Sequence, residues 1–233
     1  MIALLVMTDG RLNCLQRTIP SFLFAVDRPD LVTELWIHDD SGDPAYHDTL
    51  VELFGPVGFR VVSTAGRSGF GGAIRSAWRT LREHSTAPYV FHLEDDFVFP
   101  RMVPLSDMVE VLGSIPRLAQ MALRRQPWNA EERAAGGIVE QHPEDYGEHH
   151  IFVPGTNLRQ VNWLEHRRFF TTNPGLYRRT LVTSRDWPDG ANSEGRFGID
   201  LFADGILTAG YWGTRDSGVW CEHIGLARVG TGY

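Results

Sequence analysis

The first half of the chain alternates short apolar runs with segments in which apolar side chains recur every three or four positions. The apolar runs lie at residues 2–7, 35–37, 59–62 and 89–93. The segments with helical spacing lie between them, at residues 12–25, at 46–54 and from a glycine-rich stretch to Leu81. Repeated alternation of this kind predicts an α/β fold, with right-handed crossovers and a mostly parallel sheet flanked by helices on both faces.

The second half of the chain is less regular. Residues 127–155 are rich in charged residues, glycine, proline and histidine and have no clear period, which predicts a long loop or lid. A helical pattern returns near residues 197–209, and a last run with apolar character lies at 219–225. We expect a single domain, because 233 residues suit one large α/β unit with at most a modest appendage.

Composition excludes several classes of protein. The formal net charge of −7 argues against a broad surface that coats nucleic acid. No stretch approaches the roughly 18–20 consecutive apolar residues of a membrane span, and residues 2–7 lack the basic leader of a signal peptide. The two cysteines, Cys14 and Cys221, cannot form a disulfide framework, so we expect reduced thiols in a cytoplasmic protein.

All 22 basic residues are arginine, and there is no lysine. Codon bias in a GC-rich genome accounts for this pattern. The alternative is that adjacent arginines line a site for phosphate or another anion. The pairs concerned are Arg124-Arg125, Arg167-Arg168 and Arg178-Arg179.

Polar and acidic residues follow the apolar runs at the points where the predicted strands end. Asp9, Asp39-Asp40, the glycine-rich segment 66–72 and the triplet Glu94-Asp95-Asp96 all occupy such positions. Ligands of open parallel sheets bind at the carboxyl ends of the strands. We therefore expect these groups to form one site.

The acidic triplet is the strongest chemical signal. Three adjacent carboxylates repel one another unless a cation or hydrogen-bond donors compensate their charge. Oxygen ligands of this kind suit Mg²⁺ or Mn²⁺, which bridge to substrate phosphates. The alternative is a solvated strand end that caps the next helix.

The glycine-rich segment 66–72 is a candidate for binding phosphate. Glycines allow backbone amides to approach a ligand closely, and the helix that follows presents the positive end of its dipole. Arg67 and Arg75 could add charge-assisted hydrogen bonds to a diphosphate. The segment is neither a dinucleotide-binding fingerprint nor a P-loop.

The remaining candidates each have a structural alternative. Asp39 or Asp40 could accept a hydrogen bond from a ribose hydroxyl or a base N–H, or could cap the next helix. By itself, His223 is more typical of a packed core residue than of a ligand. Glu194 and Asp200 are six positions apart, so on one helix only one of them would face a reacting centre.

Taken in order, these segments resemble the GT-A glycosyltransferases, especially the family 2-like enzymes, over nearly the whole chain. The matching segments are residues 4–11, 39–41, 66–73, 93–97, 173–176 and 222–225. The first is similar to the opening strand and T-x-N-R turn of that family, with Gly10 in place of asparagine. Residues 93–97 resemble its DxD motif. The Glu-Asp pair familiar in that family is not plainly present near residue 195.

The resemblance implies a role for each candidate residue. The metal, Mn²⁺ or Mg²⁺, would be held by Asp96 with Glu94 or Asp95, and by His223. The donor would be a nucleotide-diphosphate sugar, with a UDP-sugar as the first candidate. Its contacts would come from residues in the strand ends and the glycine-rich segment, namely Thr8, Asp9, Arg11, Asp39, Asp40, Arg67, Gly69, Gly71 and Asp95. Glu194 would be the catalytic base, with Asp200 as the second choice. Residues 1–125 would bind the nucleotide sugar, and 126–233 the acceptor.

The function expected from these features is a metal-dependent, inverting transfer of a sugar to an acceptor hydroxyl. The acceptor is left open between a saccharide or glycolipid, a protein and a hydroxymethylated base of viral DNA. Two alternatives on the same architecture are a nucleotidyltransferase that makes sugar nucleotides and a non-catalytic module that binds them. The first normally has a lysine and a glycine-rich opening, which this chain lacks.

Overall fold

Strand β1 (Ile2–Thr8) lies between two hydrophobic cores, and its side chains alternate between them. The computed structural model describes residues 1–153 and 159–225. Leu4 and Val6 belong to one core, and Leu5 and Met7 belong to the other. Every residue of β1 is buried, as expected for a parallel strand that is covered by helices on both faces.

Among the described residues, the main sheet has nine strands in the order β3-β2-β1-β4-β9-β6-β10-β8-β7. The strands other than β1 are β2 (Val32–Asp39), β3 (Phe59–Ser63), β4 (Tyr89–Glu94), β6 (Leu118–Ala122), β7 (Gly147–Val153), β8 (Arg159–His166), β9 (Gly175–Arg178) and β10 (Thr208–Trp212). The first four strands in the chain are parallel, and β6 is parallel to β10. Strand β9 is antiparallel to both β4 and β6, and β8 is antiparallel to both β10 and β7. A separate two-stranded sheet pairs β5 (Phe97–Val98) with β11 (Glu222–His223).

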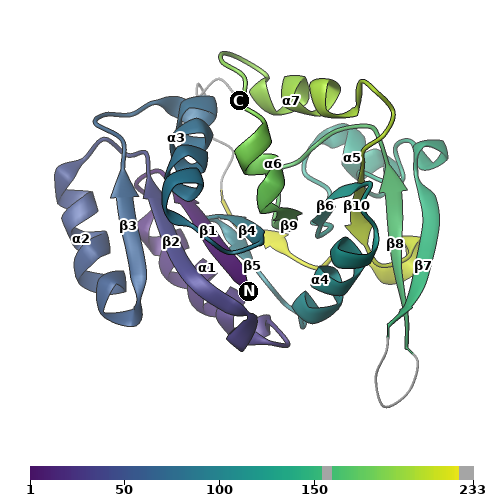
Figure 1. Ribbon diagram of the computed structural model, residues 1–233, viewed down its shortest axis with the longest axis horizontal. Coiled ribbons are helices and arrows are strands. Elements are labelled where there is room, and N and C mark those ends of the chain that lie inside the picture. The colour runs from purple at the N-terminus through teal and green to yellow at the C-terminus, as the bar shows by residue number, and fades with distance from the viewer. Residues whose placement is uncertain (154–158, 226–233) are drawn as a thin grey trace.

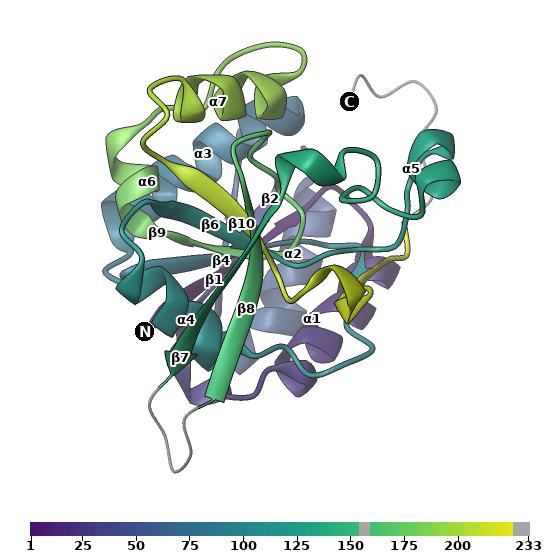
Figure 2. The ribbon, with the colours of Figure 1, turned by 90° about the vertical axis from the view of Figure 1, so that its right-hand side faces the viewer.

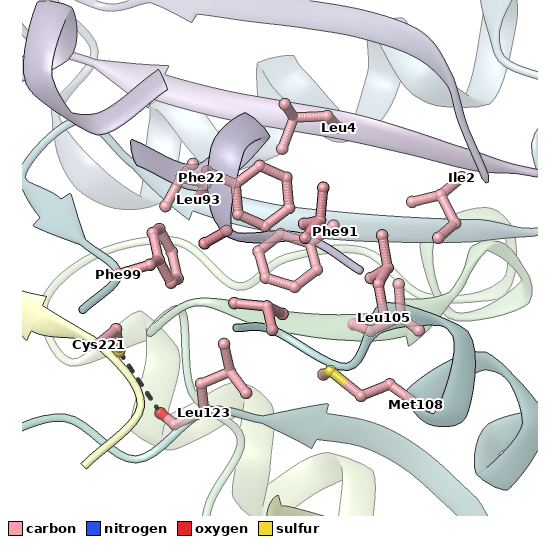
Figure 3. Close-up of a cluster of buried hydrophobic side chains, with 14 of the residues drawn as sticks. Ile2, Leu4, Phe22, Phe91, Leu93, Phe99, Leu105, Met108, Leu123 and Cys221 are labelled. Carbon is pink, nitrogen blue, oxygen red and sulfur yellow. Dashed lines mark hydrogen bonds between the residues drawn. The ribbon is translucent and has the colours of Figure 1, made fainter. Parts of the chain in front are cut away.

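Helices cover both faces of the main sheet (Figures 1 and 2). One face carries α1 (Leu12–Ala25), α2 (Pro44–Phe54) and α4 (Leu105–Ser114), and Figure 3 shows part of the core beneath them. The other face carries α3 (Gly69–His84), α6 (Arg179–Ser184) and α7 (Ser193–Phe202). The remaining α-helix in the described part of the chain is α5 (Ala130–Ala135), and short 3₁₀ turns lie at Pro29–Leu31, Gly55–Val57, Pro143–Asp145 and Arg215–Ser217.

The predicted α/β fold class, with its mostly parallel sheet and flanking helices, is confirmed. The predicted helix over residues 12–25 coincides with α1, and the helix after the glycine-rich segment is α3. Both predictions succeeded because the apolar positions of these helices point into the two cores. Strand β9, from the second half of the chain, lies between β4 and β6, so the two halves share one sheet.

Two predictions for the second half are wrong. The segment 127–155 is not a structureless loop, because it contains α5, a 3₁₀ turn and the edge strand β7. Strand β7 is largely exposed and therefore lacks the apolar alternation that would reveal it. Residues 154 and 155 lie outside the described residues. The helix placed near 197–209 ends at Phe202, and Thr208 already belongs to β10.

Both cysteines are free thiols; Cys221 is buried and Cys14 is partly so. Within residues 1–153 and 159–225, no helix has the length and apolar character needed to cross a membrane.

Candidate metal centre and nucleotide cleft

The carboxyl ends of β1, β2 and β4 meet at one edge of the sheet. Thr8 pairs in register with Asp39 of β2, and Met7 pairs with Glu94 of β4. Parallel pairing therefore brings together polar residues that are distant in the sequence. A cleft opens at this edge, and its lining comes from strand ends and from the start of α3: Met7, Thr8, Asp9, Arg11, Asp40, Arg67, Gly69, Phe70, Ala73, Ile74, His92 and Glu94.

Glu94, Asp96 and His223 offer ligand atoms that all lie within 4.8 Å of one another. Glu94 is the last residue of β4, Asp96 lies in the turn that follows, and His223 comes from β11 near the end of the described chain. Two backbone contacts bring β11 to this turn. His223 pairs with Phe97 of β5, and the Ile224 N–H donates to the Asp96 carbonyl at 2.8 Å. His223 Nε2 lies 3.2 Å from Asp96 Oδ2.

The electrostatics of this cluster favour a cation. Burial, followed by repulsion from Asp96 and the nearby Glu194, raises the pKa of Glu94 to about 8. Burial opposes ionisation of Asp96, but hydrogen bonding from His223 and the charge of Arg11 lower its pKa overall. The Arg11 guanidinium pairs with both Asp95 and Asp96, and these carboxylates raise the pKa of Arg11 despite its burial. The acidic turn thus already binds one cationic group, the guanidinium of Arg11.

The donor set also fits a divalent ion. Asp96 Oδ1 and His223 Nδ1 are buried and have no hydrogen-bond partner among the described residues. Carboxylate oxygens and imidazole nitrogens are common ligands of Mn²⁺, and oxygens are the preferred ligands of Mg²⁺. The cluster therefore offers donor atoms that the protein itself leaves unused.

Asp95 has a different environment from its two acidic neighbours. It is fully buried, and its Oδ2 accepts a hydrogen bond of 2.7 Å from the Thr8 hydroxyl. The Asp9 N–H also donates to this oxygen at 3.3 Å, and the Thr18 hydroxyl donates to the Asp95 carbonyl at 2.7 Å. Burial raises the pKa of Asp95 to about 6, although Arg11 and Thr8 oppose the shift. Asp95 thus fastens the turn after β1 to the turn after β4.

The structure distinguishes Asp40 from Asp39. Asp40 lines the cleft, and its Oδ1 accepts hydrogen bonds from the Ser68 N–H at 2.9 Å and from the Thr64 hydroxyl at 3.0 Å. Asp39 is buried, and its Oδ1 accepts a hydrogen bond of 2.8 Å from the Ser41 N–H. Of the two acids, Asp40 is the one placed to meet a ligand.

The glycine-rich segment leads into α3 at Gly69, which has a φ of +69° and lines the cleft. Arg67 lies beside it and pairs with Asp9 across the cleft. Gly71 has another role, because a Cβ there would lie 3.0 Å from Ser193 Oγ of α7. Gly71 therefore allows α3 and α7 to pack closely and is not among the cleft-lining residues.

Glu194 lies in the first turn of α7, close enough to Glu94 for its charge to raise the pKa of that residue. Its Oε1 accepts hydrogen bonds from the Thr172 N–H at 2.5 Å and from the Thr172 hydroxyl at 2.8 Å. Burial raises the pKa of Glu194, whereas the Thr172 hydrogen bonds and the charge of Arg125 oppose the shift. Asp200 lies on the exposed side of the same helix.

Sequence reasoning did not single out several residues at this site. His92 lines the cleft, and burial lowers its pKa to about 4. Thr172 holds Glu194, and Gln126 contacts the backbone of His223. His92 is a polar residue within the apolar strand β4, two positions before Glu94. This position next to the acidic triplet could have identified it from the sequence. No sequence pattern points to the other two.

No member of the three arginine pairs lines this cleft. Arg125 forms two hydrogen bonds with Glu132, at 2.7 and 3.1 Å, and Arg168 pairs with Asp145. Arg178 donates to main-chain carbonyls at the end of α4, and Arg179 donates to the Arg82 carbonyl. These guanidinium groups connect parts of the fold to one another.

No family model matches the sequence, and the comparison with curated proteins finds no match. Solved structures are nevertheless similar in fold. The mannosyltransferase PcManGT from Pyrobaculum calidifontis, in complex with GDP-Man and Mn²⁺, matches with a TM-score of 0.61 and 15% identity, over 99% of this chain and 58% of that one. S. aureus TarS 1–349 matches with a TM-score of 0.62 and 13% identity, over 95% of this chain and 60% of that one. TarS 1–349 in complex with UDP-GlcNAc matches with a TM-score of 0.60 and 17% identity, over 98% of this chain and 61% of that one.

These likenesses confirm the predicted GT-A fold. The chain spans about three fifths of the length of these solved chains.

Proposed function

We propose that this chain is a metal-dependent glycosyltransferase, which moves a sugar from a nucleoside diphosphate to an acceptor hydroxyl. The observation that carries the proposal is the convergence of Glu94, Asp96 and His223 at the rim of a cleft that reaches Asp40 and the start of α3. Support comes from the fold, which is similar to that of a mannosyltransferase solved with GDP-Man and Mn²⁺.

The cleft offers separate groups for the nucleoside and for the diphosphate of a sugar nucleotide. Asp40 is held in place by Ser68 and Thr64 and would accept a hydrogen bond from a ribose hydroxyl or a base N–H. Arg67 and the amides at the start of α3 would meet the diphosphate, because a helix N-terminus and a guanidinium both attract anions. A UDP-sugar remains the first candidate, and the GDP-Man and UDP-GlcNAc bound by the similar proteins make GDP- and UDP-sugars the first donors to test.

Glu94, Asp96 and His223 would hold Mn²⁺ or Mg²⁺, whose charge would neutralise the leaving diphosphate. Arg11, which pairs with Asp95 and Asp96, lies close enough to assist with the same phosphates. Asp95 would contribute by keeping the two turns together and not by ligation.

Glu194 is our choice for the catalytic base. In an inverting transfer, the acceptor oxygen forms a bond to the anomeric carbon while the bond from that carbon to the diphosphate oxygen breaks. The hydroxyl proton then passes to the carboxylate of Glu194. Its raised pKa suits a base that works near neutral pH, and Thr172 fixes the orientation of the carboxylate.

We infer that the acceptor is a hydroxyl of a saccharide, glycolipid or protein and not of DNA. A DNA acceptor would require the arginines between residues 124 and 179 to form a basic groove. Arg125, Arg168 and Arg178 are instead engaged within the protein. Transfer to a sugar acceptor should change little between 50 and 200 mM salt, whereas a DNA acceptor would lose affinity by orders of magnitude over about this range.

The test is donor hydrolysis, because slow hydrolysis needs no acceptor. Purified protein is incubated with UDP- and GDP-sugars and with Mn²⁺, Mg²⁺ or EDTA, and released nucleoside diphosphate is measured. We expect release with at least one donor, dependence on the metal, and loss of metal-dependent donor binding in Asp96→Asn. Asp30→Asn, at an exposed ion pair with Arg28, is the matched control.

Other outcomes would replace the proposal. Release of pyrophosphate from a nucleoside triphosphate and a sugar phosphate would identify a nucleotidyltransferase. Donor binding without hydrolysis or transfer under either metal would identify a binding module. Indifference to both metal and sugar nucleotides would refute the proposed site altogether.

A further inference from the structure

The backbone of His223 is held by the side chain of Gln126. Gln126 Nε2 donates to the His223 carbonyl at 2.8 Å, and the His223 N–H donates to Gln126 Oε1 at 2.9 Å. The carboxamide thus satisfies both main-chain groups of one residue, as a neighbouring strand would. Gln126 is separated from His223 by 97 positions in the sequence, so this contact depends on the tertiary fold.

His223 needs such support because its own element is small. Strand β11 has two residues, and its partner β5 also has two. A pair this short contributes few ladder hydrogen bonds, and an isolated two-stranded pair is only marginally stable. Gln126 supplies two further hydrogen bonds directly at His223.

The segment that carries Gln126 is itself fixed. Glu132 of α5 accepts the two hydrogen bonds from Arg125, and its Oε2 also accepts from the Trp128 N–H at 2.7 Å. Glu132 and Arg125 are both mostly buried, so little water competes for these contacts. Residues flanking Gln126 on both sides are therefore anchored to one carboxylate.

The imidazole ring is held as well as the backbone. The Trp128 ring lies edge-on to the His223 ring with centroids 4.1 Å apart, and the Phe97 ring lies edge-on at 4.8 Å. Packed between two aromatic rings, the imidazole loses the rotamer freedom that would cost free energy when it binds a metal. Its orientation toward Asp96 is thus set before any ligand arrives.

We propose that Gln126 is a positioning residue for the metal centre, which holds His223 at ligating distance from Glu94 and Asp96. This inference rests on the proposed function, because it assumes that these three residues bind the ion. Groups that orient metal ligands typically account for about 10–100-fold in metal affinity. Gln126 would act on metal affinity through a backbone, without touching the ion or the donor.

The test measures Mn²⁺ binding to the full chain by calorimetry and by electron paramagnetic resonance, without donor. We expect Gln126→Ala to weaken Mn²⁺ binding by about 10–100-fold. Gln126→Glu, which keeps an acceptor for the His223 N–H but loses the donor, should have an intermediate effect. Gln160→Ala removes an exposed glutamine that bonds to Asn162 on β8, and it should bind Mn²⁺ like the wild type.

A double-mutant cycle separates positioning from a general structural effect. If Gln126 acts through His223, Gln126→Ala should cause no further loss of Mn²⁺ affinity in a His223→Ala background. Wild-type affinity in both Gln126 variants would overturn the inference while leaving the metal centre intact. Equal losses with and without His223 would also overturn it. Failure of the wild-type protein to bind Mn²⁺ would instead count against the proposed function.

Discussion

Glu194 and Asp200 lie on one helix but in different environments. Glu194 is held by Thr172 close to the acidic turn, whereas Asp200 is exposed to solvent. A carboxylate that is partly removed from water and fixed by donors can serve as a general base, whereas an exposed one away from the cleft cannot. At the residue scale, the structure therefore supports our choice of Glu194 over Asp200.

Glu194→Gln should retain donor binding and lose about 10²–10⁴-fold in kcat for transfer. The amide oxygen of glutamine can still accept the two hydrogen bonds from Thr172, so the fold should be preserved. Asp200→Asn is the matched control on the same helix and should be close to wild type. Steady-state kinetics with a fixed donor measures both variants. Near-normal turnover in Glu194→Gln would exclude Glu194 as the base.

The sequence predicted which chemical groups meet at the site, but not which member of each set faces the cleft. Strand ends in a parallel sheet converge, so the grouping of Asp9, Asp40 and Glu94 followed from order alone. Asp39 and Asp40 are indistinguishable in that argument, because adjacent residues differ only in side-chain direction. Gly71 was assigned to the ligand because glycine allows close approach, but what approaches it is Ser193.

At the scale of elements, the sequence predicted those helices and strands whose hydrophobic pattern is clear. The helices α1 and α3 pack one face on the sheet and have a clear helical pattern. Strand β6 was missed because Gln120 and two alanines leave it without a continuous apolar run, although all five of its residues are buried. Strand β7 was missed for the opposite reason, since most of its residues are exposed. Periodicity locates amphipathic helices and continuous apolar runs locate buried strands such as β1, whereas strands with neither pattern are missed.

The position of α7 depends on a close contact at Gly198. A Cβ added there would lie 2.6 Å from the Phe170 backbone nitrogen, in the segment that leads to Thr172. Gly198→Ala should therefore destabilise the protein, because overpacking costs about 1–3 kcal/mol and outweighs the gain of about 1 kcal/mol in helix propensity. The displaced helix should also carry Glu194 away from Thr172 and lower kcat.

Gly55→Ala is the control for this prediction. Gly55 has αR backbone angles, and a Cβ there would meet nothing within 4 Å. We expect that variant to be as stable as the wild type or slightly more stable. Thermal unfolding and kcat measured on both variants give the answer. Equal melting temperatures for Gly198→Ala and the wild type would mean that α7 is not held by this contact.

At the scale of the whole molecule, stability depends on buried groups that must stay uncharged, and one of them packs against a third hydrophobic cluster that includes Tyr146 and Tyr211. His166, at the end of β8, is stacked on Tyr211 and lies beside Tyr146 and Phe169. Burial lowers the pKa of His166 to about 4, although Glu165 partly opposes the shift. An unfolded chain would protonate the same imidazole near pH 6.5.

The sign of the resulting pH dependence follows from proton binding. Between about pH 6.5 and pH 4, the unfolded state binds a proton at residue 166 that the folded state does not, so stability rises with pH in this window. The folded protein therefore has the full stability associated with a neutral His166 above pH 6.5, and it loses this stability as the pH falls toward 4. A difference of this size corresponds to about 3 kcal/mol. His166→Phe removes the titrating group but keeps a ring for the stack. As the pH falls from 6.5 to 4, the free energy of unfolding of this variant, measured with urea, should therefore fall less steeply than that of the wild type.

The exposed His84→Phe variant controls for the loss of an imidazole as such and should follow the wild-type profile. Only the difference between variants isolates residue 166, because the buried carboxyls at the acidic turn titrate in the opposite sense. Burial raises the pKa of Glu94 and Asp95, so their contribution to stability grows as the pH falls. Parallel profiles for His166→Phe and the wild type between pH 6.5 and 4 would show that His166 is protonated in the folded protein. The cluster around Tyr211 would then have to accommodate a charge.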